Sequence, residues 1–365
     1  IILVKIKIIL KMRVYILLTI LVITCSADET KIKQNNIQAQ DIVSSTEDSN
    51  IEYIVEKIEL LTAPGETSRE GSKGSTNAEL KDETVKKMEE LIDLLETPKN
   101  VYKFFNIKGL QRVITPIVSV NSERVKKQLL IIIKMLFNVA PSTTTALIPI
   151  SIVDKLLDIF EHDNNLALKT HALDILYVWL PNNPRVQARV MQLKGLEPFY
   201  DQISKLDSTV IYTLLDLFNK ILEEHLTVRA DNSLKNKDVF NKRKLYEKIG
   251  LVERMSTQTV CNGILNIFEL ILPLTDNRNE QIPKILMNLM KNIKPFCLKI
   301  YNRKSRAHKV FEGLKSYFTN TDTTALLFKL GFNLTEVKTI LEDYVKDSIL
   351  STKDIRIFKS EFKLK

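Results

Sequence analysis

Side chains that commonly carry out chemistry are few and widely spaced in this 365-residue chain. Its four histidines are His162, His171, His225 and His308, and none has a second histidine or a cysteine at the spacing of metal ligands. The sequence also lacks glycine-rich phosphate loops, the H-E-x-x-H zinc motif and the G-x-S-x-G nucleophile turn. We therefore predict a protein that is not an enzyme and that needs no metal and no cofactor.

Residues suited to binding a partner recur at matching positions of long apolar segments. The triplet Leu-Phe-Asn places Asn138 and Asn219 near the ends of two such segments, and the only tryptophan, Trp179, lies near the same level of a third. Lys134 adds positive charge one helical turn before Asn138. We predict that these four residues line a binding surface. The alternatives are a core position for Trp179 and a helix-end hydrogen bond for each asparagine. Further lysines on the same segments would suit an acidic partner: Lys126, Lys127, Lys169 and Lys220.

These segments belong to a repeat of 43 residues. The segment LKGLEPFYDQI at Leu193–Ile203, which we call the repeated phrase, is similar to IKGLQRVITPI at Ile107–Ile117. A third segment, ISIVDKLLDIF at Ile150–Phe160, lies halfway between them and has its apolar residues at the same spacing. A long helical pattern follows each phrase, and no stretch shows the two-residue alternation of a strand. The Gly-Leu step of the phrase is best explained as a turn between helices.

A period near 43 residues with two or three helices in each unit is typical of armadillo and HEAT repeats. Each unit cannot bury its apolar face alone, so stacked units share a continuous core. We therefore predict an all-α, armadillo/HEAT-like solenoid of about four repeats with capping helices. Asn138 and Asn219 resemble the asparagine near the end of the third helix of armadillo repeats, which faces the groove and holds the backbone of a partner.

The fourth repeat is interrupted. Its phrase, YEKIGLVERM, places Leu251 55 residues after Leu196, and the surplus lies in a polar, basic segment at residues 223–244 that we interpret as an inserted loop or an extended helix end. Further helical patterns follow, and the last two would cap the solenoid: 260–272, 282–301, 325–332 and 336–350.

The N-terminal region has a different character. Met12 is the expected start, and Arg13, the apolar run Val14–Thr24 and the small residues Cys25–Ala27 are typical of a signal peptide. A signal anchor is the alternative, although four basic residues interrupt the apolar stretch. We predict a polar arm at residues 28–82, disordered except for a short helix at 51–61, then a repeat domain at 83–350 and a tail at 351–365.

The remaining features set the expected environment. Without residues 1–27 the net charge falls from +9 to +5, which does not require a nucleic-acid partner. Cys261 and Cys297 are then the only cysteines, and a disulfide and two buried thiols are both compatible with the sequence. Asn333, in the sequon NLT, is a predicted glycosylation site. We expect a monomer without a stable membrane span.

A signal peptide, a polar arm and a four-repeat core together resemble the SIL/BiP-associated protein family, the nucleotide exchange factors of the endoplasmic reticulum. The most similar stretch runs from MQLKGLEPFYDQI through VIYTLLDLFNKILEE and looks like the family's Gly-Gly-Leu and Leu-Leu-Tyr-Asp-Leu region. The segment YEKIGLVERMSTQTVCNGILNIFEL follows in the order that the family has. The resemblance covers residues 83–350.

The resemblance implies a function, a partner and a compartment. Such proteins clamp one lobe of the nucleotide-binding domain of the lumenal heat-shock chaperone BiP, which accelerates ADP release, and their arm acts on the substrate-binding domain. The expected localisation is the lumen of the endoplasmic reticulum, in support of protein folding and translocation. The C-terminal FKLK matches KDEL-like retention signals poorly, so binding to a resident chaperone would have to retain the protein. The alternative is an armadillo scaffold or cargo-binding protein without exchange activity.

Overall fold

The computed structural model describes residues 50–62, 77–118, 120, 122–193, 195, 199, 202–231, 237–272 and 281–348. The predicted signal peptide, most of the predicted arm and the tail lie outside the described residues. The described residues form helices and turns but no strand, which confirms the all-α prediction. They fall into two compact units, one ending at Pro116 and the other beginning at Ile117. The predicted boundary between arm and repeat domain, at residue 83, stays a prediction.

The first described element of the first unit is a helix at residues 50–62. Its apolar side chains Ile51, Ile54, Val55 and Ile58 are at most 3% exposed, so this helix, predicted within the polar arm, is packed rather than isolated. The Nε atom of Arg112 donates to a carboxylate oxygen of Glu59 at 2.7 Å, which fixes the helix against a later turn of the same unit. The other elements are α2 (Asn77–Leu94), α3 (Pro98–Asn106), the π-helical turn η2 (Leu110–Ile114) and α4 (Thr115–Ile117), which ends at the boundary between the units.

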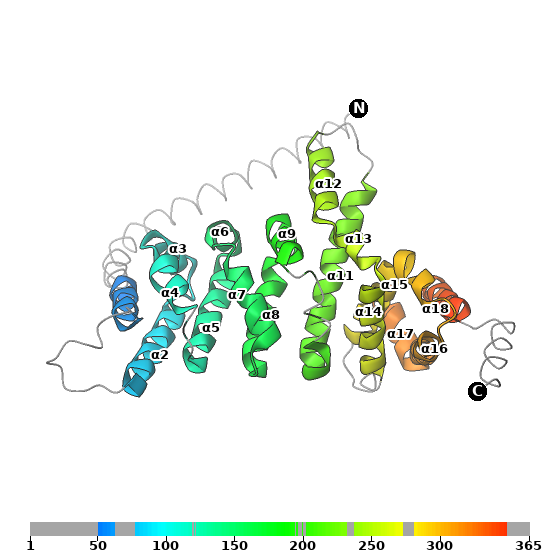
Figure 1. Ribbon diagram of the computed structural model, residues 1–365, viewed down its shortest axis with the longest axis horizontal. Coiled ribbons are helices and arrows are strands. Elements are labelled where there is room, and N and C mark those ends of the chain that lie inside the picture. Colours follow the sequence, from blue (N-terminus) through cyan, green and yellow to red (C-terminus); the bar gives the residue numbers. More distant parts are fainter. Residues whose placement is uncertain are drawn as a thin grey trace, which may run out of the picture. The chain divides into compact units, whose positions relative to one another are not determined.

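The second unit opens with three long helices that lie side by side (Figure 1). These are α5 (Glu123–Val139), α8 (Leu166–Trp179) and α11 (Ser208–Ala230). Shorter elements connect them: α6 (Pro141–Leu147), α7 (Ile152–His162), α9 (Pro184–Leu193) and η3 (Ile203–Lys205). The starts of the long helices have a local cause, because side-chain oxygens accept hydrogen bonds from free backbone N–H groups. Asn165 caps α8 in this way and Asp207 caps α11.

Aromatic rings join successive repeats of this unit. The Phe137 ring of α5 lies 5.4 Å from that of Trp179 at the end of α8. The Phe199 ring lies 5.3 Å from Phe160 of α7 and 5.9 Å from Phe218 of α11. Because α8 packs against α5 on one side and α11 on the other, its apolar residues extend nearly all round, as the predicted stacking of armadillo-like units requires.

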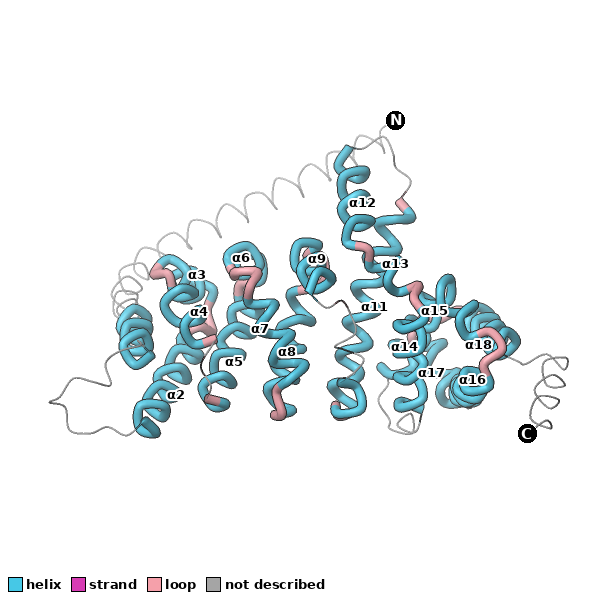
Figure 2. The backbone as a smooth tube through the Cα atoms, in the orientation of Figure 1, coloured by secondary structure: helices cyan, strands magenta, loops and turns pink. Residues whose placement is uncertain are grey.

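The helices after α11 are α12 (Lys237–Ile249), α13 (Leu251–Met255), α14 (Gln258–Ile271), α15 (Gln281–Tyr301), α16 (Ser305–Thr319), α17 (Thr321–Lys329) and α18 (Leu334–Ser348). Figure 2 shows the short α12 and α13 beside the upper end of α11 and the later helices gathered beyond them. The sequence patterns predicted α14, α15, α17 and α18 but did not single out α16. None of the helices among the described residues has the length and apolar character that crossing a membrane requires.

A cluster of buried rings, which we call the aromatic cluster, joins these last helices: Phe268, Tyr301, Phe311 and Tyr344. The Phe311 ring is stacked 4.5 Å from Tyr344 and lies 5.2 Å from Tyr301. Both tyrosine hydroxyls are satisfied, since Tyr301 donates to the Cys261 carbonyl at 2.7 Å and Tyr344 to the Met290 carbonyl at 2.8 Å. Burial raises the pKa of both phenols. The two hydroxyls are nevertheless paired, as buried polar groups in folded proteins usually are.

A disulfide joins Cys261 of α14 to Cys297 of α15, with the two Cα atoms 5.4 Å apart. It decides between the disulfide and the two free thiols that the sequence left open. Both cysteines are fully buried beside the aromatic cluster. The bond closes a 36-residue separation and holds two neighbouring helices together.

Candidate functional site

Two of the four predicted binding residues lie at the surface and two do not. Asn138 is exposed at the end of α5, and Lys134 is half-buried one turn earlier. Trp179 is only 2% exposed and packs against Phe137, and Asn219 is only 3% exposed. The prediction that Trp179 and Asn219 face a binding groove is therefore wrong, because a partner cannot reach either side chain.

The physical reason differs for the two buried residues. Trp179 lies between stacked repeats, where a large ring fills the space between α5 and α8. Asn219 is covered because α15 packs against α11, and its Nδ2 atom donates to the Ile285 carbonyl of α15 at 2.8 Å. Asn219 thus holds backbone, as predicted for an armadillo asparagine, but the backbone belongs to its own chain.

Lys169 is a second correction to the predicted basic surface. It is 5% exposed, and its Nζ atom donates to the carbonyls of Phe160 and Glu161 and to the side chain of Gln202 at 2.8 to 3.1 Å. The carbonyls belong to the end of α7, where the helix dipole favours a cation. Burial, and then nearby Lys205, lower the pKa of Lys169. This lysine fastens a helix end and offers no charge to a partner.

A row of polar side chains, which we call the polar ladder, crosses α5, α8 and α11: Lys134, Asp174, Tyr177, Asp216 and Lys220. Between α5 and α8, the Nζ atom of Lys134 donates to Asp174 Oδ2 at 2.6 Å. Between α8 and α11, the Tyr177 hydroxyl donates to Asp216, and Lys220 contacts the same carboxylate at 3.0 Å. Lys220 also donates to the Tyr177 hydroxyl and lies 3.8 Å from the centre of its ring.

The ladder is both reachable and fixed. The charged side chains of its two ion pairs are 27% to 44% exposed, so a partner can contact them. Each of these side chains is held by a residue of the same or the neighbouring helix. Less side-chain entropy is therefore lost when a partner binds. The ladder therefore presents donors, acceptors and cations at defined positions across three helices.

Local electrostatics preserve these charges. Burial raises the pKa of Tyr177, and its hydrogen bond to Asp216 raises it further, so the hydroxyl stays a donor. Burial alone would lower the pKa of Lys220, but Tyr177 and Asp216 together raise it, so the ammonium stays charged. Burial, followed by the charge of Lys134, lowers the pKa of His171 and keeps that ring neutral. The ladder can therefore bind a polar protein surface at neutral pH.

Sequence reasoning named both cations of the ladder, Lys134 as a site residue and Lys220 as a further basic residue for an acidic partner, and missed the acidic and aromatic members. The signal was present. Asp174 and Tyr177 are three residues apart and Asp216 and Lys220 four apart, which places each pair on one helix face. Asp174 and Asp216 are 42 residues apart, close to the repeat period. Polar pairs that recur with the repeat were a better indication of the surface than single large residues.

A second polar network lies in the core and serves packing. His225 of α11 is 0% exposed, and its Nε2 atom lies 2.8 Å from the Gln187 side-chain oxygen of α9. Gln187 in turn donates to the Leu180 carbonyl at 2.9 Å, and Tyr246 of α12 donates to Glu224 of α11. Burial lowers the pKa of His225 to about 4, so the ring is neutral and donates to Gln187. The network joins α9, α11 and α12.

The sequon at Asn333 lies on the surface between α17 and α18. Asn333 is exposed, and its side-chain oxygen accepts from the backbone N–H of Thr335 at 3.0 Å, which caps α18. Glycosylation there stays a prediction. Within the described residues, histidine, cysteine, aspartate and glutamate nowhere gather in a group of three or more that could bind a metal ion.

Comparison with known proteins adds one specific match. A family model with the description SIL1/FES1/HPBP1 C-terminal domain matches residues 100–325. No curated protein matches the chain.

Solved structures similar to the chain include three engineered or designed proteins of low sequence identity. One is described as an engineered protein, Northeast Structural Genomics Consortium target OR329, with 13% identity, 83% of this chain and 99% of that chain covered, and a TM-score of 0.45. The designed armadillo repeat protein YIII(Dq)4CqI has 12% identity, with 81% and 99% covered and a TM-score of 0.42. The designed armadillo repeat protein YIII(Dq.V1)4CPAF, in complex with peptide (KR)4, has 11% identity, with 82% and 99% covered and a TM-score of 0.38.

Proposed function

Because the chain belongs to the family of the SIL1/FES1/HPBP1 C-terminal domain, which implies an Hsp70-type chaperone as partner, we propose that it is a nucleotide exchange factor for BiP, the Hsp70 chaperone of the endoplasmic reticulum. It acts as a non-catalytic scaffold. Acceleration of ADP release requires only that it binds the open, nucleotide-free form of the chaperone domain more tightly than the closed form. The difference in binding free energy sets the limit of the acceleration, about tenfold for each 1.4 kcal/mol.

The polar ladder identifies the residues through which we expect the chain to act. A scaffold that favours one conformation of a partner must itself keep its shape, because a flexible surface would bind both conformations. Ion pairs and hydrogen bonds hold the ladder side chains in place across three packed helices. We propose that the ladder contacts the nucleotide-binding domain of the chaperone.

The compartment is proposed from different observations. A disulfide such as Cys261–Cys297 persists in an oxidising lumen and is rare in the cytosol. The sequon at Asn333 is exposed, so an oligosaccharide transferase has access to it. Both features support a lumenal protein, and with it BiP rather than a cytosolic Hsp70.

Release of a fluorescent ADP from purified chaperones tests the function. We expect micromolar amounts of the full chain to accelerate release from BiP, and to accelerate release from a cytosolic Hsp70 less. Unchanged release from both chaperones contradicts the exchange activity. Equal acceleration of both contradicts only the preference for BiP, and binding without acceleration favours a scaffold.

Translation in the presence of microsomes tests the compartment separately. We expect the chain to be protected from added protease and to gain one glycan that disappears in the Asn333→Gln variant. A protease-sensitive chain without a glycan contradicts the lumenal localisation.

A further inference from the structure

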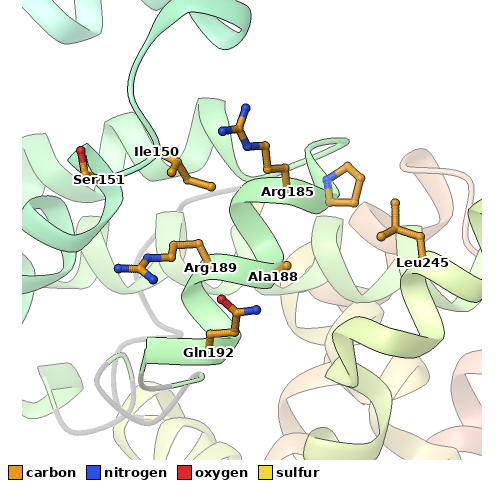
Figure 3. Close-up of a pocket in the computed structure, with 8 residues that line it drawn as sticks. Ile150, Ser151, Arg185, Ala188, Arg189, Gln192 and Leu245 are labelled. Atoms are coloured by element: carbon orange, nitrogen blue, oxygen red, sulfur yellow. The ribbon is translucent and has the colours of Figure 1, made fainter.

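A groove with a volume of about 670 Å³ runs along α9. Figure 3 shows Ile150 and Ser151 on one side of it, Leu245 of α12 on the other, and side chains of α9 between them. A second hollow of about 500 Å³ extends from there toward α13. Ala188, Gln192 and Leu245 line both hollows, so we treat them as one continuous surface, the α9 groove.

The middle of the groove is apolar. Pro184, Ala188, Met191 and Leu245 contribute aliphatic surface, and Leu245 leaves 43% of its surface in solvent. Covering apolar surface of this kind is favourable because it removes that surface from water. A bulky apolar side chain of a partner therefore has a place to bind between α9 and α12.

Ion pairs hold both walls of the groove. Arg189 of α9 donates two hydrogen bonds to Asp154 of α7, at 2.9 and 2.5 Å. Arg229 of α11 donates in the same forked way to Glu253 of α13, at 2.6 and 2.8 Å. The hydrogen bonds from the arginines lower the pKa of both carboxyl groups, so the pairs stay charged at neutral pH. The groove exists before a ligand arrives, and binding needs little reordering.

Two cations at the groove have no such partner. Arg185 and Lys248 line it and are exposed, and neither has an ion pair or a hydrogen bond within the described part of the chain. Among the described residues that line the groove, Glu253 is the only one with a carboxylate, and it is already bound to Arg229. The groove is therefore positively charged at both ends of an apolar centre.

We propose that the α9 groove binds an acidic protein segment with a bulky apolar side chain at its centre. The apolar side chain covers Ala188 and Leu245, and flanking carboxylates contact Arg185 and Lys248. A hollow shape suits a peptide better than a flat lipid surface. None of these residues belongs to the polar ladder, so the groove is a separate binding surface and does not depend on the proposed exchange activity.

Fluorescence anisotropy with a labelled peptide tests the proposal. The probe carries a leucine and a phenylalanine between two runs of three glutamates. We expect saturable binding to the full chain that weakens as salt rises, since exposed ion pairs are screened. A basic peptide with the same central pair should not compete. Absence of binding, or equal binding of the basic peptide, contradicts the proposal.

Two variants assign the binding to the groove. Arg185→Glu with Lys248→Glu should weaken binding about tenfold or more, because both contacts become repulsive. Ala188→Trp should weaken it by filling the apolar centre. The matched control, Lys299→Glu with Lys309→Glu, changes net charge equally on the exposed faces of α15 and α16 and should bind as the unchanged chain does.

The remaining outcomes also decide the question. If the Arg185→Glu, Lys248→Glu variant keeps its helicity and binds the acidic peptide normally, the groove is not the binding surface. If the chain binds vesicles that contain phosphatidylserine but not the peptide, the basic surface recognises lipid and the proposal is wrong.

Discussion

Half-exposed polar pairs form a connected row across three helices, α5, α8 and α11, whereas the ion pairs on the last helices, such as Lys294–Asp343 between α15 and α18, join only two helices each. The last helices also share a core of fully buried rings that joins α14, α15, α16 and α18. The pairs of the polar ladder join helices without closing them off from a partner. The aromatic cluster and the neighbouring disulfide are buried and fasten four helices together. The difference suggests that the second unit separates its tasks, with recognition at the ladder and stability at the cluster.

Removal of the ring at the centre of the cluster should have the largest effect. Phe311→Ala leaves a cavity among Phe268, Tyr301 and Tyr344, and we expect it to lower the free energy of unfolding by about 3–5 kcal/mol. Urea denaturation followed by circular dichroism measures the loss. The matched control is Phe328→Ala, because Phe328 is 72% exposed and its loss should change stability by less than about 0.5 kcal/mol. If both variants lost a similar free energy of unfolding, the aromatic cluster would not be the main source of stability in these helices.

Loss of the disulfide should rank next. Replacement of Cys261 and Cys297 by alanine removes the link between residues 36 apart and gives the unfolded chain more conformational freedom. We expect the free energy of unfolding to fall by about 3 kcal/mol. The same denaturation experiment measures it, with and without a reducing agent. A reducing agent should destabilise the unchanged chain and leave the double variant unaffected. If both respond alike, the effect does not come from this bond.

Acid should weaken the buried polar network around His225, which joins α9, α11 and α12. The His225 pKa is about 4 in the folded chain against 6.5 for a free histidine, so the unfolded chain binds a proton that the folded chain does not as pH falls from 6.5 toward 4. Stability is therefore lost with falling pH, by about 2 kcal/mol at pH 5 relative to pH 8. Denaturation at several pH values tests this. The His225→Gln variant, which cannot titrate, should lose less, and an identical pH dependence in both chains contradicts the assignment.

Changes to the polar ladder should affect stability least. Lys134→Ala removes one partly exposed ion pair with Asp174, and such pairs contribute about 1 kcal/mol or less. We expect a small change in the denaturation midpoint and an unchanged helical spectrum. A loss as large as that of Phe311→Ala would mean that the ladder is a structural element, and the separation of tasks would not hold.

The repeated phrase shows which parts of the fold were predictable. Its spacing located the joints between helices, but the glycine has a different cause in each copy. Gly195 has a φ of 71°, a backbone conformation that glycine adopts without strain. In the first copy Lys108 has the positive φ of 60°, and Gly109 is needed because a Cβ there would lie 2.3 Å from the Phe104 ring. The local sequence pattern thus predicted the position of each turn but not the reason why glycine is needed there.

The surface was harder to predict than the helices. Trp179 and Asn219 have the right types and spacing for a groove, but exposure depends on what packs against them. The cover of Asn219 comes from α15, whose Ile285 lies 66 residues further along the chain. Because α5, α8 and α11 are apolar nearly all round, periodicity alone does not show which of their faces stays open.

The rate of ADP release from BiP in the presence of a ladder variant tests the central claim most directly. Lys134→Glu with Lys220→Glu reverses the ladder cations, and Lys299→Glu with Lys309→Glu makes the same change of net charge on α15 and α16. We predict that the unchanged chain and the control accelerate release alike, whereas the ladder variant, although folded, loses about tenfold or more of the acceleration. Full acceleration by the ladder variant would contradict the account.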